Sequence, residues 1–96
     1  MDLNKFNASL TVDAPPEDLG PALLALWHQA KDDWDAAHRL AQTVDDADCA
    51  WVHAHLHRVE GDLSNAGHWY RRAGRTLPEV SLKREWAEIV SVLLAK

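Results

Sequence analysis

The stretch Gly61-Asp62-Leu63-Ser64-Asn65-Ala66-Gly67-His68-Trp69-Tyr70-Arg71-Arg72-Ala73-Gly74 decides the fold of this chain. It opens with a turn signal, because a glycine ends one helix and an aspartate caps the next. Small and aromatic residues then recur at Ala66, Tyr70 and Ala73, which share one face of a helix. Pro78 follows shortly and cannot continue that helix. The stretch therefore predicts the second helix of a helical hairpin.

A weaker copy of this stretch begins at Asp33, which lies 29 residues upstream of Asp62. The segment Asp33-Trp34-Asp35-Ala36-Ala37 aligns with Asp62-Leu63-Ser64-Asn65-Ala66, although Ala41 stands where Tyr70 would be expected. Self-similarity at a fixed offset is typical of helical repeats. The chain is therefore expected to contain two such hairpins.

Helical periodicity predicts an all-α fold of about five helices and no sheet. The helices are expected over about residues 18–31, 34–44, 49–59, 63–73 and 77–95. Residues 17–96 form one domain in this interpretation, since 96 residues supply a single modest core. Thr76 and Glu79 have the spacing of a capping box for the last helix.

Residues 1–16 are expected to form an extended N-terminal arm. They mix polar residues and end in Pro15-Pro16, across which a helix cannot continue. Phe6, Leu10 and Val12 are the side chains that could dock this arm on the helical body.

The last helix is expected to cap the open end of the hairpins. It carries an apolar stripe made of Trp86, Ile89, Val90, Leu93 and Leu94. The short connection favours packing against the helix at residues 63–73. Val80 and Leu82 widen the apolar face, so this helix could also support a homodimer.

On these residues the chain resembles the tetratricopeptide-like hairpin superfamily over about residues 18–78. It is also similar to a group of small bacterial and fungal proteins with a Leu-His-Arg-x-Glu-Gly-Asp-x-x-Asn-Ala-x-x-Trp-Tyr-Arg-Arg-Ala-Gly segment. The matching positions lie within Leu56–Gly74. The resemblance implies a fold and no particular chemistry, and the offset of 29 residues is shorter than the usual 34 or so.

Composition excludes several classes of function. The net charge of −5 is divided into −7 over residues 1–50 and +2 over residues 51–96, which disfavours non-specific nucleic-acid binding. No apolar stretch reaches the length of a membrane span, and the first residues lack the pattern of a signal peptide. A single cysteine fits a reducing compartment, so the expected location is the cytoplasm.

A histidine stripe offers the strongest chemical candidate. At helical spacing His53, His57 and Glu60 share one face, and His38 or His68 on a neighbouring helix could add a nitrogen. Such a set could chelate a divalent metal. The preferred interpretation is nevertheless structural hydrogen bonding within the helix pair, with metal binding second and acid–base catalysis third. No cofactor is required by the sequence.

The only concentration of basic residues could bind a carboxylate or phosphate group. It consists of Arg58, Arg71, Arg72 and Arg75, with Trp69 as the tryptophan expected to be partly exposed. The simpler interpretation is that these arginines lie at the C-terminal end of a helix, where their positive charges interact favourably with the helix dipole, and that they pair with Glu60.

Two functional hypotheses remain open. The first is a protein or peptide interaction module without enzymatic activity, because stacked hairpins form concave surfaces. The second is a metal- or small-ligand-binding protein, and so a candidate enzyme, centred on the histidine stripe.

Overall fold

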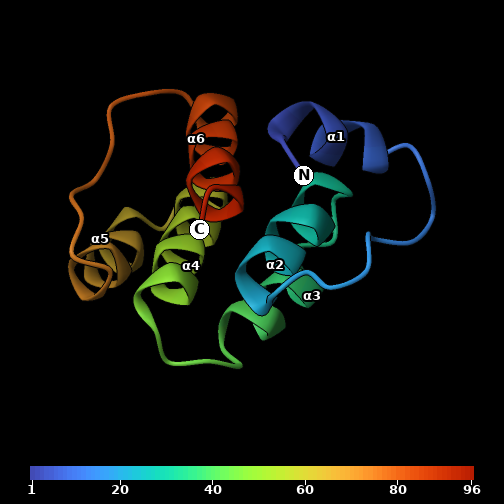
Figure 1. Ribbon diagram of the computed structural model, residues 1–96. Coiled ribbons are helices and arrows are strands. Elements are labelled where there is room, and N and C mark those ends of the chain that lie inside the picture. The colour runs from blue at the N-terminus through green and yellow to red at the C-terminus, as the bar shows by residue number, and fades with distance from the viewer.

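The computed structural model describes all 96 residues and consists of six α-helices without a strand (Figure 1). The helices are α1 (Leu3–Ser9), α2 (Pro21–Ala30), α3 (Trp34–Ala41), α4 (Ala47–Val59), α5 (Leu63–Arg72) and α6 (Leu82–Leu94). The expected all-α class is confirmed, with one helix more than the sequence indicated. None of the six combines the length and the apolar character that a membrane crossing requires.

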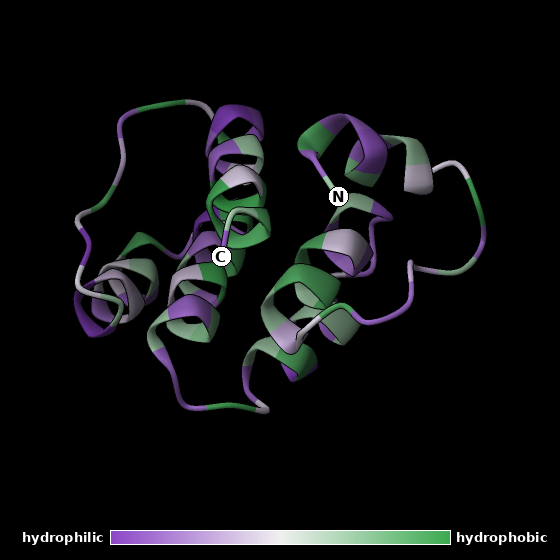
Figure 2. Ribbon diagram, viewed as in Figure 1, coloured by the Kyte–Doolittle hydropathy of each residue, from purple (hydrophilic) through white to green (hydrophobic).

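Helix α4 is the centre of the molecule, since it packs against α2, α3, α5 and α6. Every residue from Cys49 to His57 is buried, which is the pattern of a helix enclosed on all sides. Around it, hydrophobic residues gather on α2 and on the C-terminal half of α6 (Figure 2). Three of the buried residues of α4 are histidines, so its enclosed position brings titratable groups into the core.

The turns after α2 and α4 share one backbone geometry. Asp32 and Gly61 occupy the same place in the two turns and both adopt positive φ, 63° and 87°. In each turn the N–H of the following residue donates to the carbonyl five positions earlier, at 2.9 Å in both cases. This is the Schellman end of a helix. The faint internal repeat in the sequence therefore corresponds to a repeated local structure.

The helices that follow these two turns also begin alike. Asp33 accepts a hydrogen bond from the N–H of Ala36 at 3.1 Å, and Asp62 accepts one from Asn65 at 3.2 Å. Each aspartate thus satisfies an amide that the first helical turn leaves unpaired. The two expected N-caps are confirmed.

The expectation of an extended N-terminal arm is wrong for its first half, which is helix α1. Asp2 caps this helix by accepting from the N–H of Lys5 at 2.9 Å. Phe6 is completely buried and its ring centroid lies 5.8 Å from that of Trp86. This packing stabilises a seven-residue helix that would be marginal alone. Val12, in contrast, is exposed and does not dock.

Helix α6 begins later than expected. Ser81, and not Thr76, caps it, with the Arg84 N–H donating to Ser81 Oγ at 3.1 Å. The reason is tertiary, because the carbonyl of Val80 accepts a hydrogen bond from Arg58 and holds the preceding residues outside the helix.

The packing partners of α6 also differ from the expectation. This helix packs against α4, α2 and α1, and it meets α5 only through the hydrogen bond from the Tyr70 hydroxyl to Glu85. Trp86 anchors it to the first helix pair by donating its Nε1–H to the carbonyl of Leu26 at 3.0 Å. Helix α6 therefore packs beside α4 and α2, the first helix of each of the pairs α4–α5 and α2–α3, instead of continuing from α5 (Figure 1).

Candidate functional site

Three histidines from two helices meet beside the centre of the molecule. His38 comes from α3, while His53 and His57 come from successive turns of α4. One ring nitrogen from each lies within 4.8 Å of the other two. The closest pair, His38 Nε2 and His53 Nε2, is 3.0 Å apart and shares a hydrogen. We call these three residues the histidine trio.

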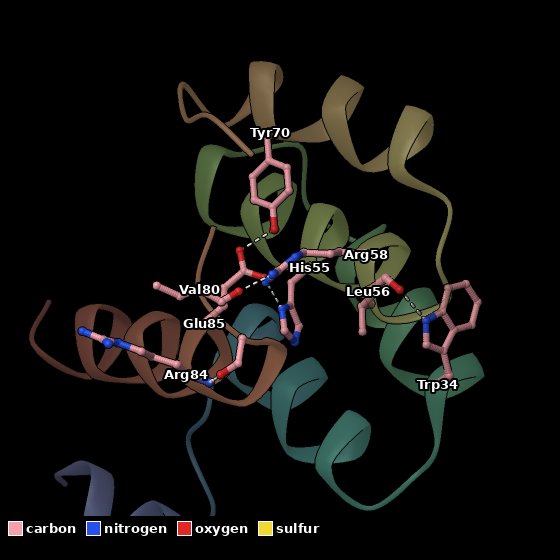
Figure 3. Close-up of polar contacts among 9 residues, drawn as sticks. Trp34, His55, Leu56, Arg58, Tyr70, Val80, Arg84 and Glu85 are labelled. Atoms are coloured by element: carbon pink, nitrogen blue, oxygen red, sulfur yellow. Dashed lines mark hydrogen bonds and ion pairs between the residues drawn. The ribbon is translucent and has the colours of Figure 1, made fainter. Parts of the chain in front are cut away.

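Aromatic rings enclose the trio on two sides. Trp34 stacks on His38 with ring centroids 4.7 Å apart, and Trp69 stacks on His53 at 3.9 Å. Trp34 is itself held, because its Nε1–H donates to the carbonyl of Leu56 at 2.8 Å (Figure 3). The imidazole rings are consequently confined to a narrow range of orientations.

The environment of His38 and His53 favours neutral imidazoles. Burial, followed by the charges that His38, His57 and His68 would carry, lowers the pKa of His53 to about 4. Burial and His57 likewise lower the pKa of His38. A neutral imidazole retains a nitrogen lone pair, which is what a metal ion requires of a histidine ligand.

Glu60 completes the histidine stripe but contacts only one of its members. His57 Nδ1 donates to Glu60 Oε1 at 2.7 Å, because a carboxylate can only accept. In the neutral tautomer with hydrogen on Nδ1, the lone pair of His57 lies on Nε2. A carboxylate behind a histidine in this way commonly orients metal ligands.

His68, the alternative third histidine of the sequence analysis, is not part of the trio. It is exposed on α5, with its ring edge-on to Trp69 at a centroid distance of 5.3 Å. The structure thus brings His38, and not His68, to His53 and His57. The sequence alone did not distinguish His38 from His68, because the angle between helices is set by packing.

A pocket of about 260 Å³ borders His53, one member of the trio. His53 and Trp69 form its inner end, and Asp45 and Arg72 lie at its rim. These two rim residues form an exposed ion pair at 2.9 Å. His53 is therefore the member of the trio that borders a surface pocket.

A second polar cluster lies on the opposite side of α4, around Glu85. This carboxylate is only 2 % exposed and accepts from His55 Nδ1 at 2.6 Å, from Arg58 Nη1 at 3.1 Å and from the Tyr70 hydroxyl (Figure 3). Burial alone would raise its pKa, but the three donors outweigh burial and hold the pKa of Glu85 below its usual range. Burial and Glu85 together raise the pKa of Tyr70.

Arg58 is therefore separated from the other arginines of the predicted basic patch. Its guanidinium group faces the interior, where it neutralises Glu85 and donates to the carbonyl of Val80. The expected pairing of a patch arginine with Glu60 does not occur, because Glu60 is bound by His57 and Arg58 by Glu85.

The remaining arginines lie near the end of α5 without forming one cluster. Arg72 lies over Trp69, 5.2 Å from the ring centroid, while Arg75 lies over Trp51 at 3.3 Å. Arg71 is exposed and has no ion pair. Trp69 is half-buried, between His53 on one side and Arg72 on the other.

Glu85 is the residue of the second polar cluster that sequence reasoning missed. Glu85 lies one turn before Ile89 and two turns before Leu93. This spacing places an acidic residue on the buried face of α6, which is unusual and could have been noticed in the sequence.

Comparison with protein-family models, with curated proteins and with solved structures finds no match to this chain.

Proposed function

We propose that this protein binds a divalent transition metal, with zinc as the typical case, through His38, His53 and His57. The observation that supports this most directly is the convergence of three imidazole nitrogens within 4.8 Å. Imidazole is a common ligand for zinc, copper and nickel. Most buried histidines form hydrogen bonds with hydroxyl, carbonyl or carboxylate groups, whereas His38 and His53 form one with each other.

The spacing suits a metal centre after small ring movements. Zinc–nitrogen bonds of about 2.0–2.1 Å at tetrahedral angles place ligand nitrogens about 3.3 Å apart. His38 Nε2 and His53 Nε2 are 3.0 Å apart, which is the distance of a hydrogen bond that a metal would replace. Three protein ligands leave the fourth position to water or a ligand, and the pocket beside His53 supplies the access.

Metal titration of tag-free protein tests this function. Thermal unfolding is measured with EDTA and then with zinc or nickel at known free concentration. Stabilisation follows from binding to the folded state alone and reaches about 2.7 kcal/mol at one hundred times the dissociation constant. Elemental analysis of the purified protein gives the stoichiometry, which should be one ion per chain.

The decisive variant is His38→Gln, because glutamine can still hydrogen-bond to His53 but is a poor zinc ligand. It should fold in EDTA and lose the metal-dependent stabilisation. His28→Ala, which removes a histidine outside the trio, should keep it. A wild-type melt that excess zinc leaves unchanged, or an equal shift in His38→Gln, would show that the trio is a structural hydrogen-bond network.

We also infer that the pairs α2–α3 and α4–α5 are tetratricopeptide-like hairpins, with α6 as a capping helix. The repeated turn geometry at Asp32 and Gly61 and the matching caps at Asp33 and Asp62 support this assignment. So does the small buried residue that follows each cap, Ala37 and Ala66 respectively.

A protein or peptide interaction is the second candidate function. A pocket of about 390 Å³ between the end of α5 and α6 is lined in part by Trp51, Pro78 and the exposed Arg75, which has no acidic partner. An acidic peptide side chain would complement this arginine. Chemical-shift mapping with a glutamate-rich peptide and its glutamine counterpart tests it. Saturable binding of the first alone, lost in Arg75→Ala, is expected.

Self-association would be the simplest form of this interaction. Leu82 and Val92 on α6 are both exposed, at 39 % and 40 % of their surface. Sedimentation velocity at micromolar concentration tests the proposed homodimer, and Leu82→Ser should shift the equilibrium towards monomer. A strictly monomeric wild type would contradict it.

A further inference from the structure

An apolar pocket of about 390 Å³ lies where α1, α2, α4 and α6 come together, away from the histidine trio. Its walls include Leu10, Ala30, Val59 and Trp86. This volume is within the range of small-molecule sites, which are mostly apolar with a few polar groups that fix orientation. The pocket opens on the side of α4 that faces α6.

Two buried polar atoms belong to residues that line this pocket and have no hydrogen-bond partner. They are Nε2 of His55 and Oε1 of Gln29, and His55 is completely buried. Buried polar atoms are almost always paired, because leaving them unpaired loses their hydration without compensation. Two such atoms at one pocket indicate a missing partner.

The hydrogen-bonding role of His55 follows from its other nitrogen. Nδ1 lies 2.6 Å from the carboxylate of Glu85, which can only accept, so Nδ1 carries a hydrogen. Arg58 Nη1 lies 3.1 Å from the same carboxylate and balances its charge. In the neutral tautomer with hydrogen on Nδ1, Nε2 is an acceptor. Gln29 Oε1 is also an acceptor.

We propose that this pocket binds a small, largely apolar molecule that carries one or two hydroxyl or N–H donors at one end. The donor end meets His55 Nε2 and Gln29 Oε1, and the apolar body packs against Trp86 and Val59. Glu85 holds the His55 ring in place from behind. The site is independent of metal binding, because His55 faces α6 whereas the histidine trio faces α3 and α5.

Matched pairs of aromatic probes test the chemistry. Phenol, 4-methylphenol and indole each carry one donor, and anisole, 4-methylanisole and 1-methylindole are the same molecules with the donor methylated. Binding is followed by the indole N–H signal of Trp86 in proton–nitrogen correlation spectra, assigned with Trp86→Phe. At least one donor probe should give a saturable shift, with an affinity about tenfold above its methylated partner.

A blocking variant locates the binding to this pocket. Ala30 is exposed at the end of α2 and lines the pocket, so Ala30→Trp should fill the entrance and weaken binding at least tenfold. Ala47→Trp is the control, since Ala47 is exposed at the start of α4 and lines no pocket. Should Ala30→Trp fail to fold by circular dichroism, Asn7→Trp closes the same pocket from α1.

Three results would overturn the assignment. Equal affinities within each pair of probes would mean that the pocket is an apolar hollow in which His55 has no role. The absence of saturable shifts for all six probes would mean that water alone satisfies the two acceptors. Unchanged binding in the blocking variant would place the probes elsewhere on the molecule.

Discussion

Replacing Glu85 by glutamine should destabilise the protein more than any other change of a single charged group. Glutamine keeps the size of the side chain and one acceptor oxygen but removes the negative charge. Arg58, whose side chain is only 14 % exposed, would then be left without its counter-charge. Breaking a buried ion pair from one side typically costs about 3–5 kcal/mol. The hydrogen bonds that glutamine retains place the expected loss near the lower end, about 3 kcal/mol.

Such a loss is large for a domain of this size, whose total stability is about 5–15 kcal/mol. Urea unfolding at pH 7 should show a lower midpoint with an unchanged slope. The matched control is Glu88→Gln, one turn along the same helix, where an exposed carboxylate lies 3.4 Å from Arg84. An exposed pair contributes about 0–1 kcal/mol. Equal effects of the two substitutions would refute the role assigned to Glu85.

The stability difference between wild type and Glu85→Gln should also depend on pH. The folded-state pKa of Glu85 is lowered, so its contribution is present above the unfolded value of about 4.3 and is lost as pH falls through the folded value. Urea midpoints of both proteins between pH 7 and pH 3 measure this. The difference should be constant above about pH 5 and shrink below about pH 4. A difference that grows on acidification would contradict the assignment of the charged state.

Three further substitutions test the packing. Asp32→Gly should raise stability by about 0.5–1 kcal/mol in calorimetry, because Asp32 has a φ of 63° that glycine adopts without strain; a lower melting temperature would contradict this. Ala66→Leu should cost about 1–3 kcal/mol in urea unfolding, since Ala66 is fully buried and a larger side chain overpacks its site. Trp86→Ala should cost about 3 kcal/mol and release α1 from α6, since Trp86 contacts Phe6 and donates to Leu26. A Trp86→Ala variant as stable as wild type would show that α6 is peripheral.

The sequence determines those features that depend on neighbours along the chain. The caps at Asp33 and Asp62 act within one helical turn, and Gly61 permits the left-handed turn between α4 and α5. The apolar stripe of α6 follows from the helical period, and the start of α3 and the extent of α5 follow from the same local rules. The sequence likewise predicts that His53 and His57 share one face of α4, because residues four apart on a helix are neighbours.

The tertiary structure decided what depends on how the helices pack. It selected His38 over His68 as the third member of the trio, and it placed Glu85 against His55 and Arg58, about thirty positions away in the chain. It also made the polar segment at Leu3–Ser9 a helix, because burying Phe6 outweighs its weak intrinsic preference. Local propensities set where most of the helices form, but a site built from several helices depends on their relative rotation, which follows from burial of the whole core.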